Sequence, residues 1–234
     1  MSKLKRVSKD IFIKGLALFL KQPDAIVLGD LHIGYEETLN RQGMLVPRFA
    51  FKDIVSQLRQ ILTRRFKLII VNGDLKHSFG WMPAQELAET KKIMAIFQAH
   101  SERLIMIKGN HDASLQGIEL LPHFSTEGFY FTHGHRLDKQ IEGAHTIIIG
   151  HEHPAITLRE GIRTESYKVF LFGKYKKKRL IVLPSFNPLI PGTNILNKKF
   201  LSPYLNQDIS DFEVFIVQDK VYEFGRIKEL KDVV

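Results

Sequence analysis

Short apolar runs that alternate with amphipathic segments are the feature that most constrains the fold of this chain. Three such runs lie in the first half, at Ala25–Leu28, Leu68–Val71 and Leu104–Ile107, and each is followed within two residues by glycine. Between them, two segments carry apolar residues at helical spacing. These residues are Phe51, Ile54, Val55, Leu58, Ile61 and Leu62 in the first segment, and Leu87, Met94 and Phe97 in the second, which begins at Pro83. The alternation predicts strand–helix–strand crossovers and an α/β fold.

The second half of the chain predicts short strands with little helix. Apolar runs lie at Phe129–Phe131 and Thr146–Ile149, and two later pairs of runs, 169–172 with 180–183 and 214–217 with 221–224, flank polar turns as hairpins do. No internal repeat or linker-like change of composition divides the 234 residues. Because single-core domains extend to roughly 250 residues, we expect residues 1–234 to form one domain.

Composition excludes several classes of protein. The chain has no cysteine, which excludes disulfides, thiolate zinc sites and cysteine nucleophiles. The basic and apolar N-terminus resembles a signal peptide only superficially, because Lys14 and Lys21 interrupt it and no cleavage site follows. No stretch approaches the roughly 20 apolar residues that span a bilayer, so we expect a cytoplasmic protein without membrane contact. The net charge of +9 suits a nucleic-acid partner, or simply a well-solvated basic surface.

Polar clusters follow five of the apolar runs, most of them beside a glycine. Ligands of α/β proteins bind outside the carboxyl ends of the strands, so these clusters are candidate site residues. Taken singly, the Asp-containing motifs are more typical of a turn or a cap, and the His-x-His pair at 151–153 suits a turn and a metal site equally. Their succession along the chain is not typical of turns or caps. Carboxylate, imidazole and amide ligands suit divalent ions such as Mn²⁺, Fe or Zn²⁺. The cluster residues are Asp30, His32, Asp74, Asn110, His111, Asp112, His133, His151, Glu152 and His153.

In this order, the motifs GDLH, NGD, GNHD, THGH and GHEH resemble those of the calcineurin-like metallophosphoesterases. The resemblance spans roughly Ile26 to Pro154, and within the family it is greatest to the small DNA-ligase-associated phosphoesterases and their archaeal relatives. It implies a four-layer α/β/β/α sandwich with a binuclear metal centre. The implied ligands are Asp30, His32 and His153 for one ion, Asn110, His133 and His151 for the other, and Asp74 bridging both. His111 would face the leaving group.

Two divalent ions can clamp the attacking and leaving oxygens of a displacement at phosphorus and provide a bridging hydroxide as nucleophile. The metal pair therefore indicates phosphoester hydrolysis. The positive charge and the subgroup resemblance lead us to expect a metal-dependent phosphodiesterase or nuclease acting on nucleotides or nucleic acid. Mn²⁺ is the first expectation, with Fe, Zn²⁺, Ni²⁺ and Mg²⁺ as alternatives. Three other hypotheses remain: a phosphomonoesterase acting on metabolites or proteins, a non-catalytic scaffold that keeps the fold, and a basic nucleic-acid-binding domain with incidental histidines.

Four further polar residues have an open role. Many family members carry an acidic residue where this chain has His77, which could touch substrate, tune the metals or do neither. His135 is a candidate of the same kind. Asp112 could orient His111 or only form a turn. Asn187 lies in the irregular loop that follows the run ending at Leu183. The subgroup resemblance implies that this loop lies beside the metals, which makes Asn187 a candidate polar contact.

The sharpest basic run lies at Gly173–Arg179. It can track phosphates, with Tyr175 available to stack on a base, or it can be a solvated hairpin tip. His100, His123 and His145 lie outside the clusters, and we assign them no role.

Overall fold

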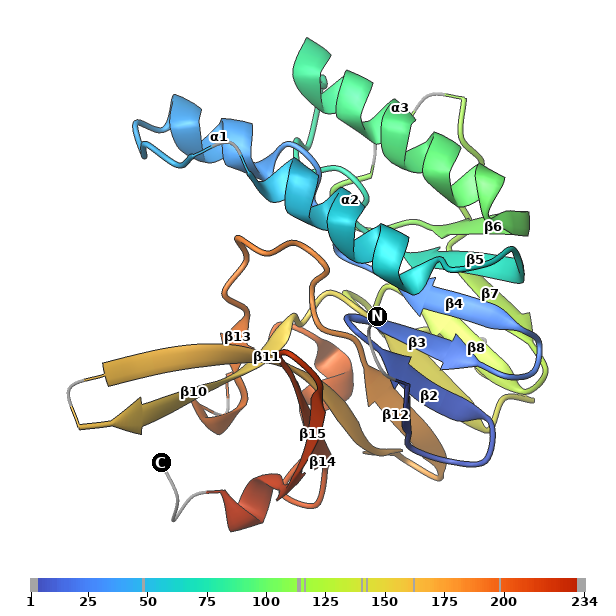
Figure 1. Ribbon diagram of the computed structural model, residues 1–234. Helices are drawn as coiled ribbons and strands as arrows, with labels where there is room; N and C mark the ends of the chain where they lie inside the picture. Colours follow the sequence, from blue (N-terminus) through green and yellow to red (C-terminus); the bar gives the residue numbers. More distant parts are fainter. Residues whose placement is uncertain are drawn as a thin grey trace.

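The structure is a computed structural model that describes residues 4–47, 49–112, 115, 117–139, 141, 143–161, 163–197 and 199–230. Residues 1–3 of the N-terminal segment discussed above lie outside this part. Among the described residues, no helix combines the length and apolar character needed to cross a membrane. Two β-sheets and three α-helices make up most of the regular structure (Figure 1).

The first sheet contains the three strands expected in the first half of the chain, and these three strands run parallel to one another. Its strands follow one another as β1 (Lys5–Arg6), β2 (Ile11–Lys14), β3 (Ala17–Leu20), β4 (Ala25–Leu28), β5 (Phe66–Asn72) and β6 (Ser101–Ile107). The pairs from β1 to β4 are antiparallel, whereas β4, β5 and β6 are parallel. The crossovers carry α1 (Tyr35–Arg41), α2 (Ala50–Ile61) and α3 (Ala84–Ala99).

The second sheet has nine strands in the order β13-β10-β11-β12-β9-β8-β7, with β14 pairing β11 and β15. The two hairpins expected from the sequence are confirmed, because β11 pairs β12 and β14 pairs β15, both antiparallel. The strands are β7 (His123–Thr126), β8 (Phe129–Thr132), β9 (Thr146–Ile149), β10 (Pro154–Glu160), β11 (Arg163–Tyr175), β12 (Lys178–Val182), β13 (Thr193–Asn194), β14 (Glu213–Val217) and β15 (Val221–Arg226).

Alternation of side chains along the strands builds three apolar layers. On β4, Val27 belongs to the cluster that joins the two sheets, where it lies with residues such as Phe131 and Ile148. The neighbouring Ile26 points the other way, into the cluster formed with α2 and α3, which cover that face of the first sheet (Figure 1). On β9, Ile147 and Ile149 belong to the third cluster, on the outer face of the second sheet.

The expected α/β class is confirmed. The four-layer α/β/β/α sandwich implied by the resemblance would have α-helices over that outer face, and the structure differs from it there. In the described part of the chain, it is formed by loops and the 3-10 helices η1 (Ile195–Asn197), η2 (Pro203–Leu205) and η3 (Ile227–Glu229). One helix face also differs from expectation. Leu87 of α3 is exposed, whereas the adjacent Glu86 is buried, because the carboxylate of Glu86 bonds to the backbone at residues 77 and 78.

Candidate metal centre

The loops that follow five strands bring the predicted ligands together at one end of the two sheets. Asp30 and His32 follow β4, and Asp74 follows β5. His133 follows β8, and the loop after β9 contributes a further pair of histidines. Because β4, β5 and β6 are parallel, and β8 and β9 are parallel, the carboxyl ends within each set meet at one edge.

The ligand loops hold a backbone conformation that side chains rarely adopt. Five of the predicted ligands have positive φ angles between 42° and 67°. Non-glycine residues in this region cost on the order of 1–3 kcal/mol each, and such strain clusters at functional sites. These residues are Asp30, His32, Asp74, His151 and His153.

Two glycines of the motifs are required by close approach. A Cβ atom on Gly73, whose φ is +91°, would lie 2.1 Å from Nδ1 of His133. A Cβ atom on Gly109 would lie 2.0 Å from Oδ1 of Asp74. The glycines therefore let the strand-end loops approach one another closely enough for their polar side chains to converge.

In the described part of the chain, three groups of converging side chains could each hold a metal ion. One consists of His32, His77 and His111, and the other two contain the predicted ligands. In one, Asp30, His32 and His153 offer ligand atoms that all lie within 4.8 Å of one another, with His153 Nε2 3.2 Å from Asp30 Oδ1. In the other, Asp74, His133 and His151 meet the same limit.

Asp74 and Asn110 extend these two groups. Oδ2 of Asp74 lies 3.3 Å from Nε2 of His133 and 3.7 Å from Nε2 of His32, so Asp74 reaches both groups. Asn110, the ligand expected after β6, places Oδ1 3.0 Å from Nε2 of His133. All seven side chains implied by the sequence therefore lie in one cluster.

The charges of this cluster suit divalent cations. Asp30 is 0% exposed and Asp74 1% exposed, and their ion-pair partners among the described residues are histidines rather than Lys or Arg. Burial would lower the pKa of His133, but its hydrogen bond to Asp74 and the charges of both carboxylates raise that pKa to about 9. A buried field that retains a proton so firmly is one that attracts metal cations.

Two other histidines have the protonation state that a metal ligand needs. Burial lowers the pKa of His32 to about 3 and that of His151 to about 4. Both rings are therefore neutral at pH 7 and keep a free lone pair, which is the form that binds metal. The donor set of carboxylates, imidazoles and one amide thus fits a pair of borderline-to-hard divalent ions.

His111 lies beside this cluster and is held by its neighbours. Its backbone N–H donates to Oδ1 of Asp74 at 2.8 Å, and its Nδ1 lies 2.5 Å from the carbonyl oxygen of His77. A carbonyl oxygen can only accept, so Nδ1 carries the proton and Nε2 remains available for chemistry. The ring of His111 meets that of His32 edge-on, with centroids 4.8 Å apart.

Asp112 and Asn187 hold the backbone of the ligand loops. Oδ2 of Asp112 accepts hydrogen bonds from the backbone N–H of Asp74 and of Gly109, at 2.8 and 2.9 Å. It therefore joins two ligand loops instead of bonding to the ring of His111. The side-chain amide of Asn187 donates to the carbonyl oxygens of Leu31 and His32, at 2.8 and 3.1 Å. Both side chains are buried, so their contacts are structural supports of the centre.

His77 and His135 lie next to the cluster. Nδ1 of His77 is 3.5 Å from Nδ1 of His32, and its ring stacks with that of His111, with centroids 5.2 Å apart. The ring of His135 lies 5.3 Å from that of His133, and its Nδ1 is buried without a hydrogen-bond partner within the described chain. Burial lowers the pKa of both histidines to about 4, so both are neutral at pH 7.

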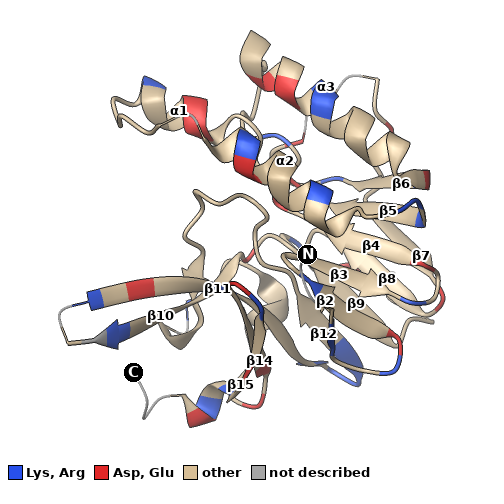
Figure 2. Ribbon diagram, viewed as in Figure 1, with Lys and Arg blue, Asp and Glu red and all other residues tan. Residues whose placement is uncertain are grey.

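The basic run at 173–179 lies at the other end of the second sheet. Arg179 pairs with Thr146 at the start of β9, whereas the ligand loop of β9 follows its last residue, Ile149. Figure 2 shows Lys and Arg spread over helices and strands rather than gathered at one edge. This run is therefore not a wall of the candidate metal centre.

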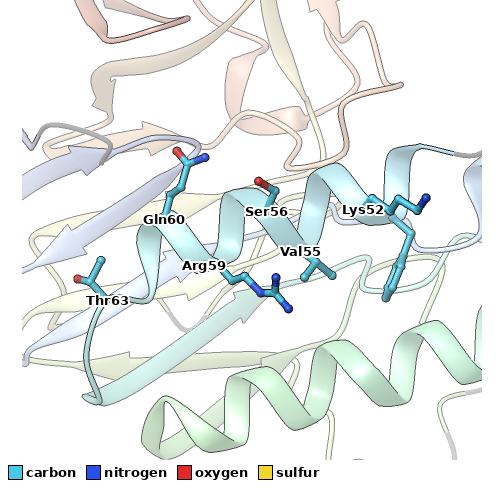
Figure 3. A pocket seen from close by; sticks show the side chains of 7 residues that line it. Lys52, Val55, Ser56, Arg59, Gln60 and Thr63 are labelled. Atoms are coloured by element: carbon cyan, nitrogen blue, oxygen red, sulfur yellow. The ribbon is translucent and has the colours of Figure 1, made fainter.

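A hollow of about 560 Å³ along α2 is also separate from the metal ligands (Figure 3). It contains neither a carboxylate nor a histidine, and we assign it no role in hydrolysis. Its lining residues are Phe51, Lys52, Val55, Ser56, Arg59, Gln60 and Thr63.

Sequence reasoning missed two charged residues that support the centre. Lys76 is 0% exposed, and its Nζ donates to the carbonyl oxygen of His111 at 2.6 Å and to that of Ser78. Glu86 of α3, 1% exposed, accepts from the backbone N–H of His77 and of Ser78. A charged residue two positions after a motif aspartate is usually solvated, so no local signal identifies Lys76.

Comparison with known proteins supports the family resemblance. A family model described as calcineurin-like phosphoesterase matches residues 25–189. Among curated proteins, the chain is 27% identical over 173 residues to the DNA polymerase II small subunit of Methanocaldococcus jannaschii. That match covers 66% of this chain but only 29% of the relative, so the chain spans less than a third of that protein's length.

One solved structure shows the same fold. The structure is similar to the Pseudomonas putida nuclease MPE, with a TM-score of 0.67 and 17% identity over 96% of this chain and 100% of that one. It also matches Yfce, a phosphoesterase from E. coli, with a TM-score of 0.37 and 14% identity over 90% of this chain and 94% of that one. The second likeness is too weak to support an argument, and the first shows the fold alone.

Proposed function

The chain belongs to the calcineurin-like phosphoesterase family and is a hydrolase acting on ester bonds; from that premise we propose that it hydrolyses phosphodiesters of nucleotides or nucleic acid. The observation that carries the proposal is the position of Asp74, which lies between two groups of ligand atoms with His111 at its side. Two buried groups that share a carboxylate are suited to a pair of divalent ions, of which Mn²⁺ is our first expectation.

We assign each implied ligand in turn. Asp30, His32 and His153 would hold one ion. His133 and His151 would hold the other, with Asn110 as the amide ligand and Asp74 shared between the two. When bound, the pair of ions supplies Lewis acidity and an activated water molecule.

The chain's own residues position the substrate and move protons. Hydrolysis adds the hydroxyl group of water to phosphorus and a proton to the leaving oxygen. When its ring is doubly protonated, His111 would give that proton from Nε2, while Nδ1–H stays bonded to the carbonyl oxygen of His77. The buried carboxylate of Asp112 holds the loops of Asp74 and Gly109 together by hydrogen bonds, so that the proton donor and the ligands keep their relative positions.

Three observations support a nucleic-acid substrate. The P. putida protein with the same fold is a nuclease, and the M. jannaschii relative is a DNA polymerase subunit. The net charge of +9 also favours encounter with polyanions. The charge is spread over the molecule, however, so the relatives carry more of this argument than the charge does (Figure 2).

Turnover of matched chromogenic substrates tests the proposal. With Mn²⁺, we expect a higher kcat/KM for a nitrophenyl phosphodiester than for the monoester, and cleavage of an oligonucleotide. The Asp74→Asn variant should lose activity by more than the roughly 10–100-fold that losing an outer metal contact costs. Asp53→Asn, an exposed acid on α2, is the matched control and should keep full activity. A strong preference for the monoester would replace the proposal with a phosphomonoesterase, and metal binding without any turnover would favour a scaffold.

A further inference from the structure

The loop between β5 and α3 exposes two large aromatic side chains, one of which contacts a residue of the candidate metal centre. Phe79 is 65% exposed and Trp81 is 80% exposed. The same loop contains His77, whose ring stacks with that of His111. Aromatic rings are usually buried, because their burial is strongly favourable. Two exposed rings on one loop are therefore unusual.

Phe79 is in direct contact with the proposed proton donor. Its ring centroid lies 3.8 Å from that of His111, with an angle of 30° between the planes. Phe79 therefore packs against His111 and still has 65% of its surface exposed. A substrate group bound next to the scissile phosphate would meet this ring.

The loop that carries the two rings is fixed at its base. Glu86 accepts hydrogen bonds from the backbone N–H of His77 at 3.0 Å and of Ser78 at 2.9 Å, and from the hydroxyl of Ser78. The ammonium group of Lys76 donates to the carbonyl oxygens of Ser78 and His111. Because Glu86 and Lys76 are buried, the backbone that leads into Phe79 is held in place, which reduces the entropy lost on binding.

We propose that Phe79 and Trp81 form a subsite that stacks a nucleobase next to the scissile phosphate. The inference rests on the proposed function, because it assigns a contact to the nucleotide part of that substrate. A flat base has a π-face that matches exposed aromatic rings, and it lies within one sugar of the phosphodiester that must reach the metals. The subsite contacts the base by its face, so it accepts all four bases.

Substrates with and without a base test the subsite. The wild type should have a higher kcat/KM for a dinucleotide than for the same phosphodiester with abasic sugars. Phe79→Ala and Trp81→Ala should each reduce this ratio by roughly 5- to 100-fold, the range expected for one stacking contact. Trp81→Phe should restore most of the ratio, because it keeps a ring. Tyr222→Ala, which removes an exposed aromatic ring on β15, is the matched control and should leave the ratio unchanged.

Tryptophan fluorescence gives a second readout that needs no turnover. Trp81 is the only tryptophan of the chain, so its emission reports on this loop alone. A nucleoside monophosphate should quench the emission, whereas ribose 5-phosphate at the same concentration should not.

The outcomes separate the inference from the proposed function. If the wild type cleaves dinucleotide and abasic substrates equally well, or if both variants lose activity equally on the two, the subsite does not exist although the enzyme is a phosphodiesterase. Equal quenching by the two phosphates leads to the same conclusion. If the wild type cleaves no phosphodiester, the proposed function itself fails.

Discussion

Several side chains of the centre are held by backbone with positive φ, a conformation that is unfavourable for residues other than glycine. Asp30, His32 and Asp74 all have positive φ, as does the histidine pair after β9. Substituting a ligand therefore removes a metal contact and also changes the cost of an already strained turn. For this reason, variants that keep the shape of a side chain, such as Asp74→Asn, test the chemistry more cleanly than alanine.

His111 is the residue whose role is most sharply testable. We predict that His111→Ala lowers kcat by about 10²–10⁴-fold with unchanged metal content, because a positioned proton donor contributes that much. The loss should be larger for esters with a poor leaving group, which need the proton most. Steady-state kinetics over a series of substituted phenyl esters measures this dependence. The exposed His145 provides the control, since His145→Ala should match the wild type. Equal losses across the series would contradict a role in protonation.

The sequence was sufficient to place the predicted ligands but not their supports. Asp74 and Asn110 could be expected at one site because each follows an apolar run that predicts a strand, and the family resemblance implied their role as ligands. Lys76 and Glu86 could not, because their burial depends on contacts between a loop and a helix that are formed only in the folded chain. The sequence leaves the role of Asp112 open between orienting His111 and forming a turn. Its hydrogen bonds to the loops of Asp74 and Gly109 are long-range contacts of the same kind.

At the scale of elements, the connection between β5 and α3 links the fold to the centre. We predict that Lys76→Met lowers the free energy of unfolding by about 1–3 kcal/mol, because two carbonyl oxygens lose their donor. It should also lower kcat by roughly 10–100-fold, as loss of an outer support of a metal site does. Urea unfolding and steady-state kinetics measure the two effects.

Lys14 provides the matched control for this prediction. It is a buried lysine of β2 whose Nζ donates to the carbonyl oxygen of Ile61 at 2.6 Å, away from the ligand loops. Lys14→Met should therefore lower stability while kcat stays unchanged. If Lys76→Met behaves in the same way, the loop does not position His111.

A lysine that contacts the loop after β12 should make the free energy of unfolding depend on pH. Lys168 of β11 donates to the carbonyl oxygens of Ser185 and Asn187, and burial lowers its pKa to about 7, with the charge of Asp30 opposing the shift. In the unfolded chain this pKa is about 10.4. Between these values the unfolded state binds more protons, so the contribution of Lys168 to the free energy of unfolding rises with pH.

Urea unfolding at pH 7, 8, 9 and 10 measures that contribution. The wild type should gain stability over this range relative to Lys168→Met, which keeps the length of the side chain but cannot ionise. Parallel curves for the two proteins would show that the lysine stays protonated in the native state.

Elements were predicted well where the pattern of burial was local. The strands of the motifs and both later hairpins follow from apolar runs bounded by turns. The hairpin of β2 and β3 was missed, because both of its strands are buried on nearly every residue and show no alternation. Without alternation, an apolar stretch of this length does not distinguish strand from helix.

At the scale of the whole molecule, we propose that residues 1–234 form one domain. The cluster that joins the two sheets takes residues from both, including Ile70 of the first and Phe170 of the second. Separating the two sheets would expose the apolar residues of this cluster to water. We therefore predict a single unfolding transition in urea, with coincident curves from far-UV circular dichroism and from the fluorescence of Trp81. Two separated transitions would show that the sheets belong to independent units.

The central claim is that seven side chains, gathered from five strand ends, hold two divalent cations. Anomalous diffraction from crystals grown with Mn²⁺ tests it most directly. The account predicts two peaks about 3.5–4 Å apart, one beside Asp30, His32 and His153 and the other beside Asn110, His133 and His151, with Asp74 between them. A single peak, peaks elsewhere on the molecule, or none at saturating Mn²⁺ would contradict it.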